Sequence, residues 1–138
     1  MLVKGSCHCG AIAYEAQVET ERVGLCHCSD CQMFSGSAFR ISAPTNPGSL
    51  RFLRGVPKVY VKTADSGRRR RQAFCDRCGS PVYSSDDVDD ARVFTLRTGC
   101  LEQKASLKPQ RQIWCQSALD WTGEIAAIPG DTGQRFRL

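Results

Sequence analysis

The stretch Cys26-His27-Cys28-Ser29-Asp30-Cys31 places three thiols within six residues, in the spacing C-x-C-x-x-C. Zinc in proteins is held tetrahedrally and readily takes thiolates as ligands. In a C-x-x-C step both sulfurs can reach one ion, and the preceding C-x-C step adds a third. Three protein ligands leave one position open, as in catalytic zinc sites that hold water or substrate. The stretch therefore predicts an open zinc site.

Four further cysteines occur as two pairs, Cys7 with Cys9 in a C-x-C step and Cys75 with Cys78 in a C-x-x-C step. Together they supply the four thiolates of a closed, structural zinc site. Gly79 follows the second pair, where glycine permits a positive φ and leaves backbone amides free to hydrogen-bond the sulfurs. We therefore predict two zinc ions, one structural and one catalytic.

The remaining cysteines and the two histidines are not expected to bind metal. Cys100 and Cys115 stand alone in apolar surroundings, and we expect them to pack in the core. The total of nine cysteines is odd, whereas a disulfide framework favours an even number. His8 and His27 each lie between two cysteines, so in an extended segment their side chains point away from those thiols. We expect them to face outward or to form hydrogen bonds.

The size and composition of the chain fit one globular domain over residues 1–138. No stretch approaches the ~20 apolar residues of a membrane span. The first six residues lack the apolar run of a signal peptide, so we expect a cytoplasmic protein that does not bind membranes. Thiols stay reduced in that compartment, which favours metal binding over disulfides.

Nineteen basic and 14 acidic residues give a net charge of +5, and much of the excess lies in Arg68-Arg69-Arg70-Arg71. An excess of this size permits an anionic ligand. We interpret the run as a solvated hairpin tip and residues 84–90, with their four aspartates, as an exposed acidic loop. Arg40, Arg69, Arg70 and Arg71 are also candidate partners for ligand carboxylates. Few aromatic residues accompany the arginines, so nucleic acid is not an expected partner.

Turn residues divide the chain into many short segments with strand character. Residues 11–18 alternate apolar and polar side chains, which is the period of a half-buried strand. Ser29 and Asp30 favour the start of a short helix. We expect the tail to be irregular and to pack through Trp121 and Phe136. These patterns predict an all-β domain stapled by zinc, with at most one or two short helices and with strands near residues 2–6, 11–18, 38–41, 49–54, 57–63, 81–83, 92–97 and 112–116.

The cysteine pattern resembles the glutathione-dependent formaldehyde-activating enzyme family, a domain type also found in centromere protein V. The resemblance rests on residues 5–10, 26–31 with 35–37, and 74–79, and it extends over nearly the whole chain. It implies an Mss4-like β-sheet fold and two sets of zinc ligands. The structural ligands would be Cys7, Cys9, Cys75 and Cys78, and the ligands of the catalytic zinc would be Cys26, Cys28 and Cys31.

The resemblance also implies a reaction, the condensation of formaldehyde with glutathione to S-hydroxymethylglutathione, which is classed as carbon–sulfur lyase chemistry. The expected partners are thus a small thiol such as glutathione and a small aldehyde. Fold alone does not determine function, and two alternatives stay open. One is a non-catalytic zinc-binding interaction module, and the other is a redox protein that uses residues 26–31 as a thiol switch.

Overall fold

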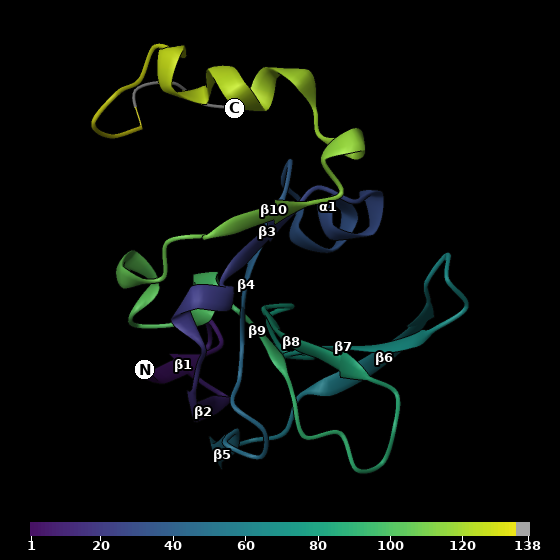
Figure 1. Cartoon of the computed structure of the whole chain (residues 1–138). Coiled ribbons are helices and arrows are strands. Elements are labelled where there is room, and N and C mark those ends of the chain that lie inside the picture. The colour runs from purple at the N-terminus through teal and green to yellow at the C-terminus, as the bar shows by residue number, and fades with distance from the viewer. Residues whose placement is uncertain (135–138) are drawn as a thin grey trace.

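The computed structural model describes residues 1–134, and Figure 1 shows their strands arranged in two sheets. The smaller sheet has three antiparallel strands in the order β1-β2-β5. Its strands are β1 (Leu2–Ser6), β2 (Ala13–Gln17) and β5 (Arg51–Arg54). Alternate residues of β1 and β2 are buried, as the period of two predicts.

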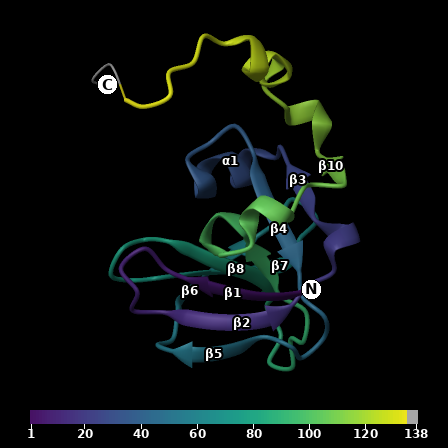
Figure 2. The ribbon, with the colours of Figure 1, turned by 90° about the vertical axis from the view of Figure 1, so that its left-hand side faces the viewer.

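The larger sheet has seven strands in the order β10-β3-β4-β9-β8-β7-β6. Its strands are β3 (Gly24–Cys26), β4 (Arg40–Pro44), β6 (Lys58–Thr63), β7 (Arg69–Phe74), β8 (Pro81–Asp86), β9 (Thr95–Arg97) and β10 (Arg111–Ile113). Strand β10 runs parallel to β3, and the other neighbours pair antiparallel. Figure 2 shows the sheets from a second direction.

Helical structure is limited to short segments. The α-helix α1 spans Ser29–Ser35 and ends at Gly36, which adopts the left-handed conformation with φ 59°. Single 3-10 turns are η1 (Thr20–Arg22), η2 (Thr98–Cys100), η3 (Lys104–Ser106) and η4 (Cys115–Ser117), and a longer 3-10 segment is η5 (Asp120–Ala127). The prediction of an all-β, Mss4-like fold with one or two short helices is confirmed. Among residues 1–134, no helix has the length and apolar character needed to span a membrane.

The hydrophobic core packs one face of the larger sheet against the smaller sheet. Val3 and Tyr14 of the smaller sheet are fully buried in it. From the larger sheet, Ala43, Leu96 and Tyr83 face this core at successive cross-strand positions. Because side chains alternate along a strand, the intervening residues of β4, β9 and β8 point away from the core.

Several local predictions are wrong. The strand expected at 92–97 begins only at Thr95, and the one expected at 112–116 ends at Ile113. Strands β3 and β7 were not predicted. Strand β7 includes most of the arginine run, so that run is not a hairpin tip.

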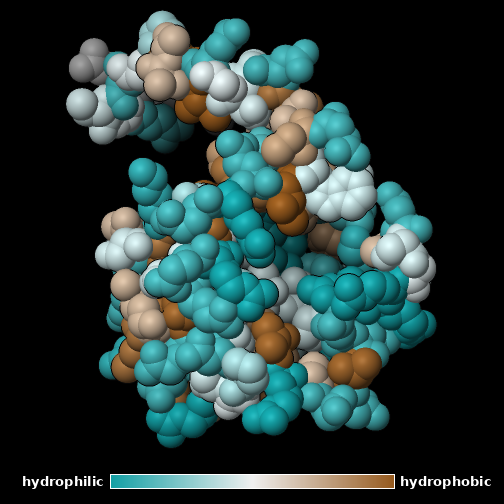
Figure 3. All heavy atoms as spheres, viewed as in Figure 1, coloured by the Kyte–Doolittle hydropathy of each residue, from teal (hydrophilic) through white to brown (hydrophobic). Residues whose placement is uncertain are grey.

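The tail also differs from the prediction. Residues 115–134 project away from the strands (Figure 1). In the same view drawn as spheres, this arm overhangs a gap beside the rest of the molecule (Figure 3). Trp121 is 50% exposed, although it was expected to pack. Cys115 is exposed too, whereas Cys100 is half-buried, with its thiol donating to the Pro81 carbonyl at 3.2 Å. Phe136 lies outside the described residues.

Candidate functional site

The two predicted cysteine pairs meet and join the two sheets. The Sγ atoms of Cys7, Cys9, Cys75 and Cys78 all lie within 4.8 Å of one another. The Sγ atom of Cys9 is 3.6 Å from that of Cys7 and 3.8 Å from that of Cys75. Tetrahedral zinc with Zn–S bonds of about 2.3 Å requires sulfurs about 3.8 Å apart. The donor set therefore fits a closed zinc site between the β1–β2 and β7–β8 connections.

Backbone turns prepare this cluster of four thiols. Gly79 adopts φ 74°, as its place after Cys78 predicts, and its amide donates to the Cys75 carbonyl at 2.8 Å. The Ile12 amide donates to the Cys7 sulfur at 3.2 Å. The side chain and backbone of Ser80 hydrogen-bond the Cys78 sulfur and lower the pKa of that thiol to about 5. These contacts favour thiolates, the form that binds metal.

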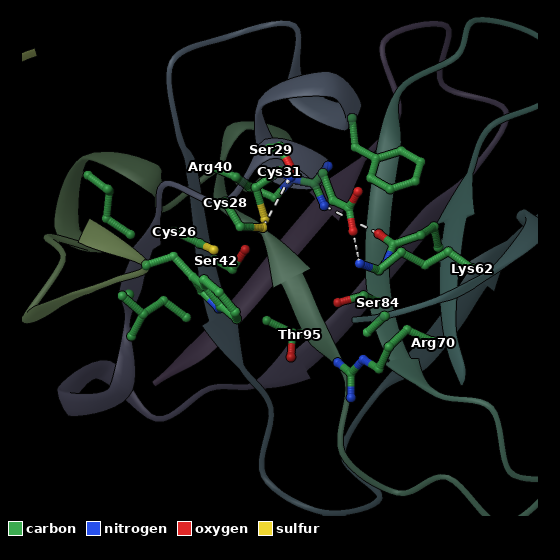
Figure 4. Close-up of a pocket in the computed structure, with 18 of the residues that line it drawn as sticks. Cys26, Cys28, Ser29, Cys31, Arg40, Ser42, Lys62, Arg70, Ser84 and Thr95 are labelled. Atoms are coloured by element: carbon green, nitrogen blue, oxygen red, sulfur yellow. Dashed lines mark hydrogen bonds and ion pairs between the residues drawn. The ribbon is translucent and has the colours of Figure 1, made fainter. Parts of the chain in front are cut away.

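The three thiols of the opening stretch form a second, separate cluster. The Sγ atoms of Cys26, Cys28 and Cys31 lie within 4.8 Å of one another, at the end of β3 and the start of α1. Cys28, rather than Ser29 or Asp30, caps α1, because its sulfur accepts the Cys31 amide at 3.4 Å. The donor set fits a metal ion with three protein ligands. Figure 4 shows the three cysteines grouped at one side of a pocket.

The pKa values of two thiols in this cluster of three are shifted in opposite directions. A hydrogen bond with Cys31 lowers the pKa of Cys26, and the same bond raises the pKa of Cys31. His27 does not join them. Its Nε2 is hydrogen-bonded with the Gln112 side chain at 2.8 Å, and its ring is buried. His8 is exposed, so neither histidine points at a cluster, as the alternation predicts.

The pocket beside the three thiols is lined by the face of the larger sheet that points away from the core. Its volume is about 620 Å³. The cross-strand pairs on this face are Cys26 with Arg40, Ser42 with Arg97, Thr95 with Ser84, Ser84 with Gln72, and Arg70 with Lys62. Every one of these residues lines the pocket. This polar face of the larger sheet thus extends from the three thiols across six strands.

Two arginines on this face are almost completely buried. Arg40 is 6% exposed and Arg97 is 7% exposed. Gln72 Oε1 accepts hydrogen bonds from Arg40 Nη1 at 3.3 Å and from Arg97 Nη2 at 3.0 Å. Arg97 Nη1 also donates to Ser42 Oγ at 2.8 Å. Burial, followed by the nearby charge of Arg40, lowers the pKa of Arg97 to about 9, and burial also lowers the pKa of Arg40. Arginine side chains carry their positive charge at neutral pH.

Several other charged groups around the pocket are in ion pairs. Asp30 forms an ion pair with Lys62, so its carboxylate is not a helix cap. Asp86 accepts from Arg68 at 2.7 Å and from Arg70 at 2.6 Å. Asp87 accepts from Arg69 and from Arg71, each at 2.8 Å. The acidic loop therefore neutralises the arginine run, and neither segment is the free charged surface that the sequence suggested.

Sequence reasoning named all seven clustered cysteines but not the polar pocket face. Arg40 was considered as a carboxylate partner, whereas Gln72 and Arg97 were missed. A signal for Arg97 was present, because Thr95 and Arg97 flank the apolar Leu96 in an alternating segment. It indicated a polar side of β9, but not what that side faces.

Comparison with known proteins agrees with this arrangement. Residues 2–117 match the family described as glutathione-dependent formaldehyde-activating enzyme. The chain belongs to this family. The matched region includes both cysteine clusters and every strand of the two sheets, whereas η5 lies beyond it.

Two individual proteins are similar to this family member. A Schizosaccharomyces pombe protein named as an uncharacterized lyase is 30% identical over 80 residues, which are 58% of this chain and 55% of that protein. The match thus spans about half the length of the curated relative. A Rhodobacter sphaeroides protein of known crystal structure, a structural genomics target, superposes with a TM-score of 0.61 at 23% identity. The superposition covers 79% of this chain and 98% of that one, and it shows a shared fold.

Proposed function

We propose that the chain is a zinc-dependent carbon–sulfur lyase that acts on glutathione or a related thiol and a small aldehyde. The family match and the name of the yeast relative support lyase chemistry. The observation that carries the proposal is the contrast between the two clusters: one offers four thiols, and the other offers three beside a pocket. A structural and an open metal site would have these donor sets.

In this proposal Cys7, Cys9, Cys75 and Cys78 hold the structural zinc, and Cys26, Cys28 and Cys31 hold the catalytic zinc. A zinc ion with one free position supplies a place where a thiol loses its proton and becomes nucleophilic near neutral pH. The addition forms one carbon–sulfur bond. The thiol releases a proton and the aldehyde oxygen gains one, so no oxidant or reductant is needed.

The residues of the chain position the reactants for this addition. The Cys31 amide donates to Cys28 Sγ, which holds that sulfur in place beside the other two. Cys26 lies in β3, which is paired with β4 on one side and β10 on the other, so the backbone that carries this thiol is held in place. The nine free cysteines suit a reducing compartment, and we place the protein in the cytoplasm. The neutralised arginine run argues against a nucleic-acid partner.

Zinc content per chain tests this proposal directly. Elemental analysis should find two zinc ions in the wild type and one in Cys28→Ser. Cys115→Ser removes an exposed thiol outside both clusters and should keep two. On titration with glutathione, X-ray absorption at the zinc edge should report an added sulfur neighbour, and Cys28→Ser should abolish that change.

Catalysis is measured separately as the rate at which formaldehyde and glutathione form S-hydroxymethylglutathione above the uncatalysed rate. Cys28→Ser should lose this acceleration, and Cys115→Ser should keep it. If the zinc content is the same in all three proteins, or if glutathione adds no sulfur neighbour, the three-cysteine cluster is not an open thiol site. A non-catalytic zinc-binding interaction module would then be the better description.

A further inference from the structure

Arg40 and Arg97 are buried cations without an anionic partner in the described chain. None of the ion pairs among residues 1–134 includes either one. The group between them is the neutral amide oxygen of Gln72. Nε and Nη2 of Arg40 are buried with no hydrogen-bond partner among the described residues. A buried charge is costly unless it is paired and hydrogen-bonded, so this arrangement is suited to a bound anion.

The two arginines would hold this anion close to the three thiols, where the reaction is proposed to occur. Arg40 is the direct cross-strand neighbour of Cys26, and such neighbours have Cβ atoms about 4.5–5.5 Å apart. Arg97 lies one strand further along the same face, opposite Ser42. An anion held by both guanidinium groups is therefore within reach of a small molecule whose other end lies at the three thiols.

The balance of charges around the pocket also favours a bound anion. Three thiolates with one zinc(II) carry a net charge of about −1, and the two arginines carry +2. The nearby carboxylate of Asp30 is balanced by Lys62. One of the arginines would offset the cluster, and the second leaves a surplus of one positive charge. Arg68 and Arg70 also line the pocket and share the single carboxylate of Asp86, so this group adds to the positive surplus.

We propose that Arg40, Gln72 and Arg97 bind a carboxylate of the substrate, so that the enzyme takes a small thiol or aldehyde bearing its own acid group. This inference rests on the proposed function and names its substrate class. A planar carboxylate matches the fork of a guanidinium group, with the free Nε and Nη2 of Arg40 as donors. The carboxylate belongs either to the thiol or to the aldehyde, and two experimental arms separate these sources.

The thiol arm compares 3-mercaptopropionate with 1-propanethiol on the zinc-loaded protein by titration calorimetry. Hydrogen bonds to a charged group are worth enough that the acid should bind about tenfold to a hundredfold more tightly. The aldehyde arm compares glyoxylate with acetaldehyde, using 1-propanethiol as the thiol, and follows adduct formation by NMR. A preference for the acid in either arm supports the proposal and identifies the source, and equal behaviour in both arms overturns it.

Arg40→Met should reduce the preference to within about twofold, because it removes the free donors. Arg111→Met is the matched control, since Arg111 is an exposed arginine on the rim of the same pocket. It removes the same charge and should retain the preference. If both variants lose the preference equally, general attraction of anions explains it and the specific site is refuted.

Gln72→Glu gives a second test that does not depend on whether Arg40→Met folds. The new carboxylate would lie between the two guanidinium groups and take the place of the substrate's acid group. We expect a higher melting temperature and no preference for the acid. A lower melting temperature with the preference intact would contradict the proposal.

Propionate, which has no thiol, separates this inference from the proposed function. Binding of propionate to the wild type that is lost in Arg40→Met supports the carboxylate site even if no thiol binds at the cluster. Binding of 1-propanethiol that is as tight as that of 3-mercaptopropionate, with no binding of propionate and no preference for glyoxylate, preserves the thiol site and refutes the carboxylate site.

Discussion

The backbone at Trp114 leads to a prediction in which a glycine variant is more stable than the corresponding alanine variant, the reverse of the usual order. Trp114 adopts φ 58° and ψ 41°, the left-handed region that residues with a Cβ atom avoid. It follows β10 and begins the turn of η4, whose Ser117 amide donates to the Trp114 carbonyl at 3.0 Å. Ser117 in turn accepts from Gln32 of α1. The strain therefore lies where the chain turns from the sheet toward the helix that contains Cys31 and is capped by Cys28.

Two substitutions, Trp114→Ala and Trp114→Gly, isolate that strain. Both remove the indole and its contacts, so their difference reports the backbone alone. The left-handed conformation costs an alanine about 1–2 kcal/mol. Glycine avoids this cost but loses about 0.5–1 kcal/mol more in conformational entropy on folding. The glycine variant should therefore be the more stable of the two by about 1 kcal/mol, the difference between these two costs.

Urea unfolding of the zinc-loaded variants, followed by circular dichroism, measures this difference. With a urea dependence of about 1–3 kcal/mol per molar, the midpoint should shift by about 0.3–1 M. Ile113 is the control, because it is similarly exposed but lies in the extended strand β10. There the order should reverse, with alanine more stable than glycine by about 0.5–1 kcal/mol. If alanine is at least as stable as glycine at both positions, the strain at Trp114 is absent.

Three further outcomes are expected. A hydrogen bond from Arg70 lowers the pKa of Asp86, so its contribution to stability is present above the unfolded pKa of about 4 and is lost as the pH falls through the folded value. The difference in melting temperature between wild type and Asp86→Asn should accordingly shrink as the solution is acidified below that pH. Leu96→Ala removes a fully buried side chain and should cost about 2–5 kcal/mol in urea unfolding, whereas a loss below ~1 kcal/mol would mean that the core collapses around it. Gly55→Ala should destabilise the protein more than Gly67→Ala does: both glycines have positive φ, but only at Gly55 would a Cβ atom collide with the carbonyl oxygen in the β1–β2 connection. Equal melting temperatures for these two variants would contradict that steric account.

The two cysteine clusters could be predicted because their information is local. A C-x-C or C-x-x-C step brings its sulfurs together whatever the rest of the chain does, and four plus three donors match the two kinds of zinc site. The assignment of Cys7 and Cys9 to the same cluster as Cys75 and Cys78 required only that the pairs be combined. The all-β class followed from the short alternating segments and the turn residues between them.

The pocket could not be predicted in the same way, because it depends on the register of six strands. Arg40, Gln72 and Arg97 are far apart in the sequence, and they converge only when β4, β9, β8 and β7 are paired as observed. The arginine run was misinterpreted for a related reason. Its partners, Asp86 and Asp87, are brought alongside by the β7–β8 pairing, and all four arginines are held in ion pairs with them.

The parallel pairing of β10 with β3 has a consequence for the order in which the protein is made. Gln112 lies 85 residues after His27, yet the two side chains are hydrogen-bonded and their strands are neighbours. At translation rates of about 5–20 residues per second, the ribosome needs about 4–17 s to add that length of chain. Throughout that interval the edge of β3 next to Cys26 has no strand beside it. A nascent chain can thus bring its four-thiol cluster together once Cys78 has been made, well before β10 covers the edge of β3, so the surroundings of the three-thiol cluster are completed late in synthesis.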